Sequence, residues 1–313
     1  MFLETDNSLY HLARAIRPRQ WIKNFSIFAA ITFGGYLFDP EIFFKAFSAF
    51  IIFCLLSSAT YLINDIHDAP KDKLHPIKRN RPIPSGKLSP QTASTAAVFF
   101  LVFAFLASLV LVNFYFFFIC FSYFIMQIFY TYKARNVIII DALVVSMGFI
   151  FRVLAGGFAT GVSISSWLIL ATIGLAMLLA FGKRRSERTI LSASGLSMET
   201  RKTLAHYPDS LLDSMISMSA SFAIITYSLF TFQVSPQESL GIVKRFLPTS
   251  LSNPKWMMLT IPLVIYGVAR YLYVIYEKKS AESPERVLLQ DKPLLATTLL
   301  WSSSIVLLLY IFS

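Results

Sequence analysis

Nine long apolar runs, separated by shorter charged segments, dominate the sequence. A run of about 20 apolar residues is long enough for an α-helix to cross the hydrocarbon core of a membrane. With 56% hydrophobic and 14% charged residues, the chain also has too few polar side chains to cover the surface of a soluble protein. The sequence therefore predicts an all-α, polytopic membrane protein that forms a single domain over residues 1–313, with one transmembrane helix for each run. The runs are 22–38, 42–62, 92–112, 114–131, 137–158, 166–182, 214–233, 256–276 and 294–312.

The basic residues are distributed unevenly between the two ends of these runs. If the N-terminus is cytoplasmic, the segments on the cytoplasmic side hold 22 of the 28 Lys and Arg residues. This bias follows the positive-inside rule, so the net charge of +11 indicates an orientation in the membrane rather than a nucleic-acid partner. We expect a multi-pass protein of the cell membrane whose N-terminus and long charged loops face the cytoplasm. On the outer side, the amphipathic stretch ESLGIVKRFL is predicted to lie along the membrane surface. The cytoplasmic segments are 1–23, 63–90, 131–136, 183–210 and 277–293.

An acidic cluster stands at the end of the second run. Asn64, Asp68 and Asp72 follow an i, i+4, i+8 spacing, which places them on one side of a helix, and Asp65 adds a third carboxylate. Carboxylates this close repel one another unless a cation lies between them. Mg²⁺ prefers oxygen ligands and bridges to substrate phosphates, so the pattern predicts a Mg²⁺ site. A solvated helix end with scattered charges is the alternative. Pro70 disfavours the helical conformation before it, so Asp72 is expected past a kink.

Two basic segments extend this prediction. Lys78, Arg79 and Arg81 directly follow the acids, which favours a diphosphate held jointly by metal and arginines. Their alternative role is to set topology or to contact anionic lipid. In the second segment, FGKRRSER, Lys183 and Glu187 are four residues apart and share one helix face. We interpret this segment as a second wall of the same anion site, with a surface ion pair as the alternative.

Polar residues inside or beside the apolar runs need a separate explanation. In RPRQWIKN, membrane anchoring accounts for Trp21 but poorly for Gln20 and Asn24. Asp141 and Arg152 lie in the fifth run, separated by about 16 Å of helix rise, and so cannot pair with each other. Charges inside a membrane span normally face an interior cavity and serve function. Pairing with another helix is the structural alternative.

The motifs also resemble those of a known family. YLINDIHDAPKD resembles the NDxxDxxxD motif of the UbiA superfamily of intramembrane prenyltransferases. RPRQWIKN, HPIKRNRPIPSG, FRVLAGG, FGKRRSER and PERVLLQDKPLL are similar to the branch of decaprenyl-phosphate phosphoribosyltransferases, in the same order along nearly the whole chain. The resemblance implies a bundle of helices around a central cavity that opens to lipid. It also implies Mg²⁺-dependent transfer of 5-phosphoribosyl from 5-phosphoribosyl 1-diphosphate (PRPP) to a polyprenyl phosphate, with release of diphosphate.

Roles for single residues follow from this resemblance. It implies that Gln20 and Lys23 line the site near the lipid phosphate. Where the family commonly has Lys-His after the fourth span, this chain has Arg135 and Asn136, which keeps the charge and alters hydrogen bonding. The expected metal ligands are Asn64, Asp68 and Asp72, with Asp65 close by. The expected catalytic residues are Asp68, Asn64 and Lys23. The expected substrate-binding residues are Arg17, Gln20, Lys78, Arg79, Arg81, Arg135, Lys183, Arg184 and Glu187.

The sequence leaves two alternatives to phosphoribosyl transfer. An aromatic prenyltransferase would use the same Mg²⁺ site to ionise a prenyl diphosphate, and usually has a second aspartate-rich motif. Residues 183–210 hold Glu187, Glu199 and Asp209 but no DxxxD pattern, which counts against this reading. A transporter or flippase would use the acids to bind a coupling ion. The basic clusters on both sides of the acids favour a phosphorylated substrate instead.

Overall fold

The structure is a computed structural model that describes residues 8–74, 78–193, 207–235, 255–277 and 284–311. Within these ranges every regular element is a helix. The predicted surface stretch ESLGIVKRFL lies outside them. The α-helices are α1 (Ser8–Ala15), α2 (Ala29–Phe33), α3 (Pro40–Asp72), α4 (Pro90–Ala107), α5 (Phe114–Tyr132), α6 (Ile140–Thr160), α7 (Ser166–Ala193), α9 (Asp209–Val234), α10 (Ile261–Tyr276), α11 (Pro284–Gln290) and α12 (Lys292–Val306). The 3₁₀ segments are η1 (Pro18–Phe28), η2 (Lys78–Asn80), η4 (Ala134–Asn136) and η8 (Trp256–Thr260), and π turns extend α4 over Ser108–Val112 and α12 over Leu307–Ile311.

Among the described residues, eight helices are long and apolar enough to cross a membrane. They correspond to eight of the predicted runs. Their outer faces carry large apolar side chains: on α4, Phe99, Val102 and Phe103 are 50–63% exposed. A soluble protein rarely leaves so broad an apolar surface in water, so lipid surrounds these helices. The chain is therefore an all-α, multi-pass membrane protein, as predicted. The eight helices are Pro40–Asp72, Pro90–Val112, Phe114–Asn136, Ile140–Thr160, Ser166–Thr189, Asp209–Val234, Trp256–Tyr276 and Lys292–Ile311.

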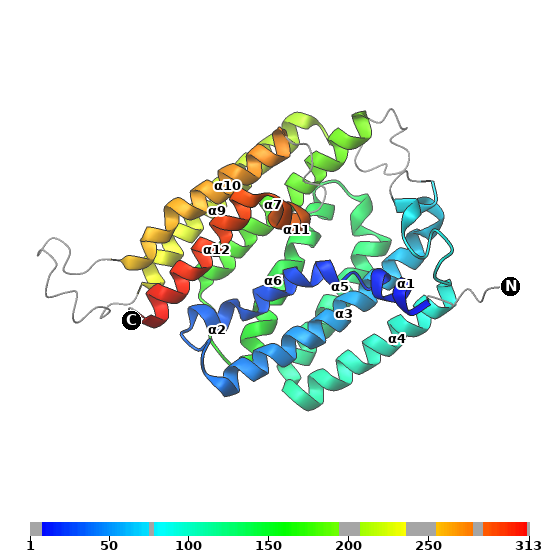
Figure 1. Cartoon of the computed structure of the whole chain (residues 1–313), viewed down its shortest axis with the longest axis horizontal. Coiled ribbons are helices and arrows are strands. Elements are labelled where there is room, and N and C mark those ends of the chain that lie inside the picture. Colours follow the sequence, from blue (N-terminus) through cyan, green and yellow to red (C-terminus); the bar gives the residue numbers. More distant parts are fainter. Residues whose placement is uncertain (1–7, 75–77, 194–206, 236–254, 278–283, 312–313) are drawn as a thin grey trace, which may run out of the picture.

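The first predicted run differs from the other eight. It forms the 3₁₀ helix η1, directly continued by the short helix α2, instead of one long α-helix. The path ends where Gly35 takes a positive φ of 83°, a conformation that glycine adopts without strain. Figure 1 shows this N-terminal path crossing the face of the bundle. Its inward side chains therefore reach the centre of the molecule from one side.

Helix α6 lies between two apolar clusters and joins them. One cluster is built mainly on α7, α9 and α10, the other on α3, α4 and α5, and both include residues of α6. Helix α6 also contacts η1, and this contact is unusually close. A Cβ atom on Gly156 would lie 1.9 Å from the carbonyl oxygen of Ile27, so only glycine fits at this crossing. The crossing fixes η1 against the middle of the bundle.

The end of α3 departs from the expected kink. The helix continues through Pro70 to Asp72, and the Lys73 amide still donates to the Ala69 carbonyl at 3.1 Å. Pro70 is exposed and lacks the amide that would donate to the Ile66 carbonyl, but the helix continues past it to Asp72. Asp72 therefore stays buried on the same helix as Asp65.

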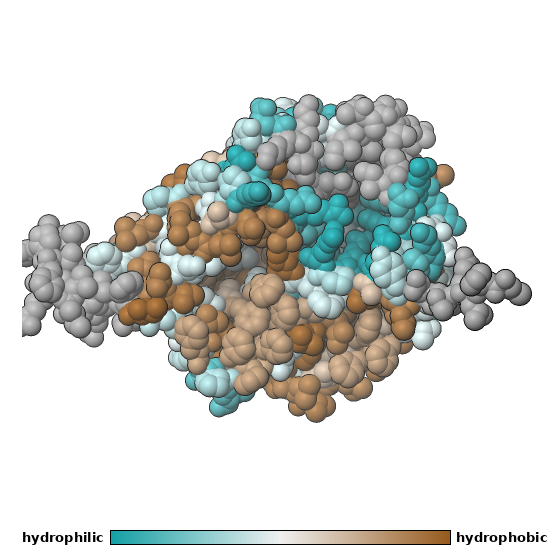
Figure 2. Space-filling model, in the orientation of Figure 1, coloured by the Kyte–Doolittle hydropathy of each residue, from teal (hydrophilic) through white to brown (hydrophobic). Residues whose placement is uncertain are grey.

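Most of the hydrophilic side chains on the surface in view gather in one region. Figure 2 shows hydrophilic residues gathered in the region where α11 and the end of α3 lie, above a broad hydrophobic surface. In a membrane protein, such a division separates the part that meets water and head groups from the part that meets acyl chains. The acidic cluster of α3 lies at this polar end.

Candidate functional site

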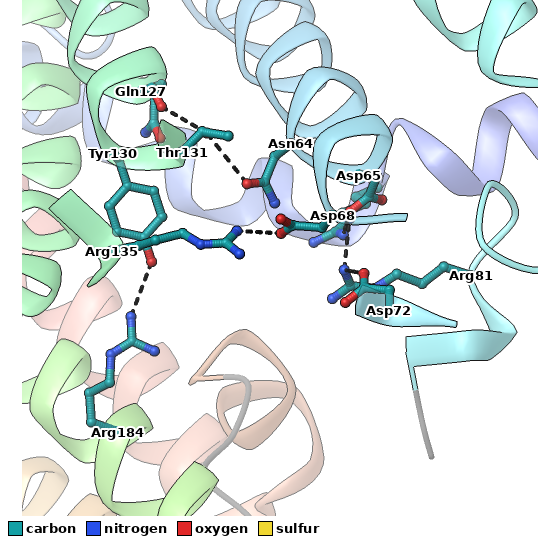
Figure 3. A network of polar contacts seen from close by, with 11 residues as sticks. Asn64, Asp65, Asp68, Asp72, Arg81, Gln127, Tyr130, Thr131, Arg135 and Arg184 are labelled. Carbon is teal, nitrogen blue, oxygen red and sulfur yellow. Dashed lines mark hydrogen bonds and ion pairs between the residues drawn. The ribbon is translucent and has the colours of Figure 1, made fainter. Parts of the chain in front are cut away.

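Arginines hold the carboxylates at the end of α3. Arg81 contacts Asp65 at 3.1 Å and Asp72 at 2.6 Å, and so bridges two acids that are two helical turns apart (Figure 3). Arg17 approaches Asp65 from the other side, just before η1 begins. Burial lowers the pKa of Arg17, but the carboxylate of Asp65 more than offsets this and leaves the pKa above its ordinary value. Both arginines are only partly buried, so each has one side open toward an incoming anion.

The third aspartate faces the opposite wall of the site. Asp68 Oδ2 accepts a hydrogen bond of 2.5 Å from Arg135, which follows α5 (Figure 3). The amide oxygen of Asn64 lies one turn away and accepts a bond of 3.4 Å from Thr131. The other oxygen, Asp68 Oδ1, is buried and accepts no hydrogen bond from any described residue. A buried carboxylate oxygen without a donor is costly, so this atom is a candidate to bind a further ligand.

A magnesium ion fits these residues in one specific way. Among the described residues, no three Asp, Glu, His or Cys side chains converge into a ready-made metal cage. Mg²⁺ rarely needs one: it is usually bound by one or two carboxylates, several waters and substrate phosphates. The free oxygen Asp68 Oδ1 and the nearby amide oxygen of Asn64 suit that mode.

A row of polar residues leads from this cluster into the bundle. In a 3₁₀ helix, residues three apart stand above one another, so Gln20 and Lys23 share one face of η1, and Arg17 directly precedes the helix. Gln20 donates to Glu285 Oε1, and Lys23 donates to the Gln20 side-chain oxygen at 2.5 Å. Lys23 also lies 3.4 Å from Glu285 Oε2. Glu285 belongs to α11, which packs against η1.

Glu285 is ionised in this setting. Burial raises the pKa of its carboxyl group, but the charges of Lys23 and Lys183 and the hydrogen bond from Gln20 leave the pKa below its ordinary value. Glu285 was not among the residues predicted for the site, although the motif PERVLLQDKPLL contains it. The available signal was its position in a charged segment, predicted to be cytoplasmic, just before an apolar run.

The predicted second wall is built around a fully buried arginine. Arg184, on α7, pairs with Asp141 of α6 at 2.7 Å and with Glu187 at 2.6 Å. It also donates to the Tyr130 hydroxyl at 3.2 Å. Since two carboxylates already surround it, Arg184 ties α5, α6 and α7 together. Lys183, more exposed, lies 3.9 Å from Glu187.

The intramembrane Arg152 has neutral partners. Its three guanidinium nitrogens donate to Asn24 Oδ1 at 2.7 Å, the Gly148 carbonyl at 2.6 Å and the Tyr123 hydroxyl at 3.2 Å. The ring of Phe53 lies 5.6 Å from the charge and adds a cation–π contact. Asp141 and Arg152 therefore contact different helices, as their spacing predicted, and Asn24 is explained as a partner of Arg152.

The remaining predicted substrate-binding residues follow the acids in the short helix η2. Lys78 is half-buried and Arg79 is exposed, and both belong to η2. A second aspartate pair was missed because the predicted cytoplasmic segment 183–210 ends between its two members. Asp209 and Asp213 form a DxxxD spacing at the start of α9. In the structure both contact Arg185, at 3.3 Å and 2.9 Å.

The chain is similar in sequence and in fold to known proteins. The chain is 30% identical over 309 residues to decaprenyl-phosphate phosphoribosyltransferase of Mycolicibacterium smegmatis, covering 96% of this chain and 92% of that protein. It is 30% identical over 303 residues to the protein of the same name from Corynebacterium glutamicum, covering 96% and 87%. A solved structure of a UbiA homologue from Archaeoglobus fulgidus bound to GPP and Mg²⁺ superposes with a TM-score of 0.66. At 17% identity, over 96% of this chain and 99% of that one, it shows the shared fold.

A family model gives the assignment. The model described as the UbiA prenyltransferase family matches residues 25–290, which include α3 with its acids, the buried Arg184 and Glu285. The match begins after Arg17, Gln20 and Lys23, and it spans the rest of the polar site and most of the helices that hold it. The chain belongs to the UbiA prenyltransferase family, a family of membrane-embedded transferases.

Proposed function

We propose that the protein transfers the 5-phosphoribosyl group of PRPP to a polyprenyl phosphate and releases diphosphate. Within the structure, the observation that carries this proposal is the alternation of acids and arginines at the end of α3: Arg17, Arg81 and Arg135 beside Asp65, Asp68 and Asp72. Such an array suits a highly charged substrate bound with a metal. The two phosphoribosyltransferase relatives, similar over 96% of this chain, support PRPP as that substrate.

The proposed reaction is one substitution at carbon 1 of the ribose. An oxygen of the lipid phosphate forms a bond to this carbon, and the bond from the carbon to the diphosphate oxygen breaks. The electron pair leaves with the diphosphate. In this proposal Arg81 and Arg135 bind the diphosphate, and their positive charges stabilise the negative charge that develops on it. Lys23, further along η1, is placed to orient the lipid phosphate.

Asn64 and Asp68 are the residues that would hold Mg²⁺, with Asp65 and Asp72 beside them. When bound, the ion supplies charge neutralisation to the diphosphate leaving group. Asp65 and Asp72 keep Arg81 in place through their ion pairs. The arginines and the metal would thus act on the same diphosphate group.

The location of the site suits two very different substrates. PRPP is polar and made in the cytoplasm, whereas a polyprenyl phosphate stays in the bilayer. A site at the end of a membrane helix, between polar and apolar surfaces, is accessible to both (Figure 2). We propose that this end of the bundle faces the cytoplasm, in line with its excess of Lys and Arg.

Equilibrium binding tests the proposal. The purified protein with Mg²⁺ is expected to bind PRPP. An isoprenyl diphosphate should compete poorly with PRPP for this site. Asp68→Asn is expected to weaken Mg²⁺-dependent binding, while Glu41→Gln, a change at an exposed acid at the start of α3, serves as the control. Preferential binding of isoprenyl diphosphate by the wild-type protein would refute the proposal.

One observation favours a second candidate, an aromatic prenyltransferase. Asp209 and Asp213 provide a DxxxD pair, and the A. fulgidus homologue of the same fold is bound to GPP and Mg²⁺. Here, however, both aspartates are engaged by Arg185. Replacing both by asparagine separates the two functions. A second metal site would be lost with them, whereas phosphoribosyl transfer is expected to persist.

A further inference from the structure

Two buried polar atoms, one on α11 and one on α10, lack a hydrogen-bond partner among the described residues. Glu285 Oε2, on α11, and the Tyr271 hydroxyl, on α10, form no hydrogen bond with any described residue. Their residues are only 5% and 4% exposed, and the charge of Glu285 acts on the Tyr271 hydroxyl. Lys23 is 3.4 Å from Glu285 Oε2 but is not oriented to donate to it. Buried groups of this kind normally find a partner in a ligand or a water molecule.

The geometry of η1 relates this place to the acidic cluster. Arg17, the residue before η1, binds Asp65, and Gln20, in the first turn of η1, binds Glu285. Three residues span at most about 10 Å of chain, so Arg17 and Gln20 lie close together. Lys23 stands about 6 Å further. This separation suits a sugar ring whose diphosphate lies at the end of α3.

We infer that Glu285 binds the ribose of PRPP by accepting hydrogen bonds from its 2- and 3-hydroxyl groups, with the Tyr271 hydroxyl as a second polar contact. This inference rests on the proposed function and adds a specificity-determining residue to it. An ionised carboxylate can only accept hydrogen bonds, so its ligand must donate them. Two hydroxyls on neighbouring ring carbons do so, whereas another phosphate would be repelled.

The same residue discriminates against the rival donor. An isoprenyl chain has no hydrogen-bond donor, and placing it against Glu285 would leave a buried charge facing an apolar group. The carboxylate is ionised because Lys23 and Gln20 offset the effect of burial. Glu285 therefore favours a sugar diphosphate over an isoprenyl diphosphate at a site that could otherwise bind either.

The test compares PRPP with its 2-deoxy and 3-deoxy analogues. Dissociation constants are measured for the purified full-length protein with Mg²⁺. The wild-type protein is expected to bind at least one analogue tenfold or more weakly than PRPP, since a hydrogen bond to a charged group is lost, roughly a ten- to hundredfold effect. Glu285→Gln is expected to weaken PRPP binding by about tenfold. It should also reduce the ratio between the dissociation constants of that analogue and of PRPP. Glu277→Gln, at an exposed acid after α10, is the matched control and should keep the wild-type ratio.

The possible outcomes are distinct. If Glu285→Gln binds PRPP and both analogues more weakly by the same factor, Glu285 only positions α11 and the inference is wrong. If the wild-type protein binds PRPP and both analogues equally, the inference is wrong whatever the variant does, even if the variant does not fold. If the wild-type protein binds no PRPP at all, the proposed function fails first and the inference fails with it.

Discussion

At the residue scale, charge balance explains how three aspartates remain close together at the end of one helix. Each carboxylate has an arginine partner, and Arg81 serves two of them. The positive charges of these arginines offset the mutual repulsion of the three carboxylates. Asp68 alone keeps a buried oxygen without a donor. The residues are therefore not equivalent, although their spacing in the sequence makes them look alike.

Replacing Asp68 should separate activity from folding. Asp68→Asn is expected to reduce transfer by roughly 100- to 1,000-fold, because the leaving group loses charge neutralisation. Thermal unfolding in detergent should change little, since the amide keeps the shape of the carboxylate beside Arg135. Glu41→Gln is the control for a lost carboxylate elsewhere on α3. A folded Asp68→Asn variant with near-normal turnover would rule out the metal site.

At the element scale, the sequence predicted the long helices well and their contacts poorly. Apolar runs of membrane-spanning length identified eight of the helices, because in lipid the backbone must satisfy its own hydrogen bonds. The apolar run 22–38 did not predict the 3₁₀ form of η1, whose Gln20 side chain contacts Glu285 far along the chain. Arg184 was expected to grip phosphate, but a linear sequence does not reveal that Asp141, on another helix, pairs with it.

The close crossing of η1 and α6 provides a test at this scale. Gly156→Ala is expected to lower the free energy of unfolding by roughly 1–3 kcal/mol, because the added methyl group would overlap the Ile27 backbone. It should also weaken substrate binding, since η1 carries Gln20 and Lys23. Gly267→Ala is the matched control: its nearest neighbouring atom is 3.9 Å away, so stability should stay the same or rise. Equal effects of the two substitutions would contradict the crossing.

The Arg184 network provides another test. Arg184→Met is expected to destabilise the protein by roughly 3–5 kcal/mol, because it leaves Asp141 and Glu187 buried without their cation. Adding Asp141→Asn to this variant should restore part of the loss. Thermal unfolding of the two single variants and the double variant measures the coupling. Strictly additive losses would show that the two side chains do not interact.

At the scale of the whole molecule, the account requires the polar end of the bundle to face the cytoplasm. Ser85 lies in the loop after η2 and Ser163 between α6 and α7, and both are exposed. In a background without Cys54 and Cys120, a cysteine at Ser85 is expected to react with an impermeant maleimide only from the cytoplasmic side. A cysteine at Ser163 should react only from outside. Labelling of both positions from the same side would contradict the arrangement of helices.

The most direct measurement concerns the transferred group itself. Purified protein in lipid vesicles with Mg²⁺ is supplied in one reaction with isotopically labelled PRPP and polyprenyl phosphate, and in a second with labelled isoprenyl diphosphate and an aromatic acceptor. Mass spectrometry identifies the lipid products. The account predicts a phosphoribosyl-phosphoryl-polyprenol and one diphosphate per product in the first reaction, with no prenylated aromatic in the second. A prenylated aromatic product, with PRPP left unconsumed, would contradict it.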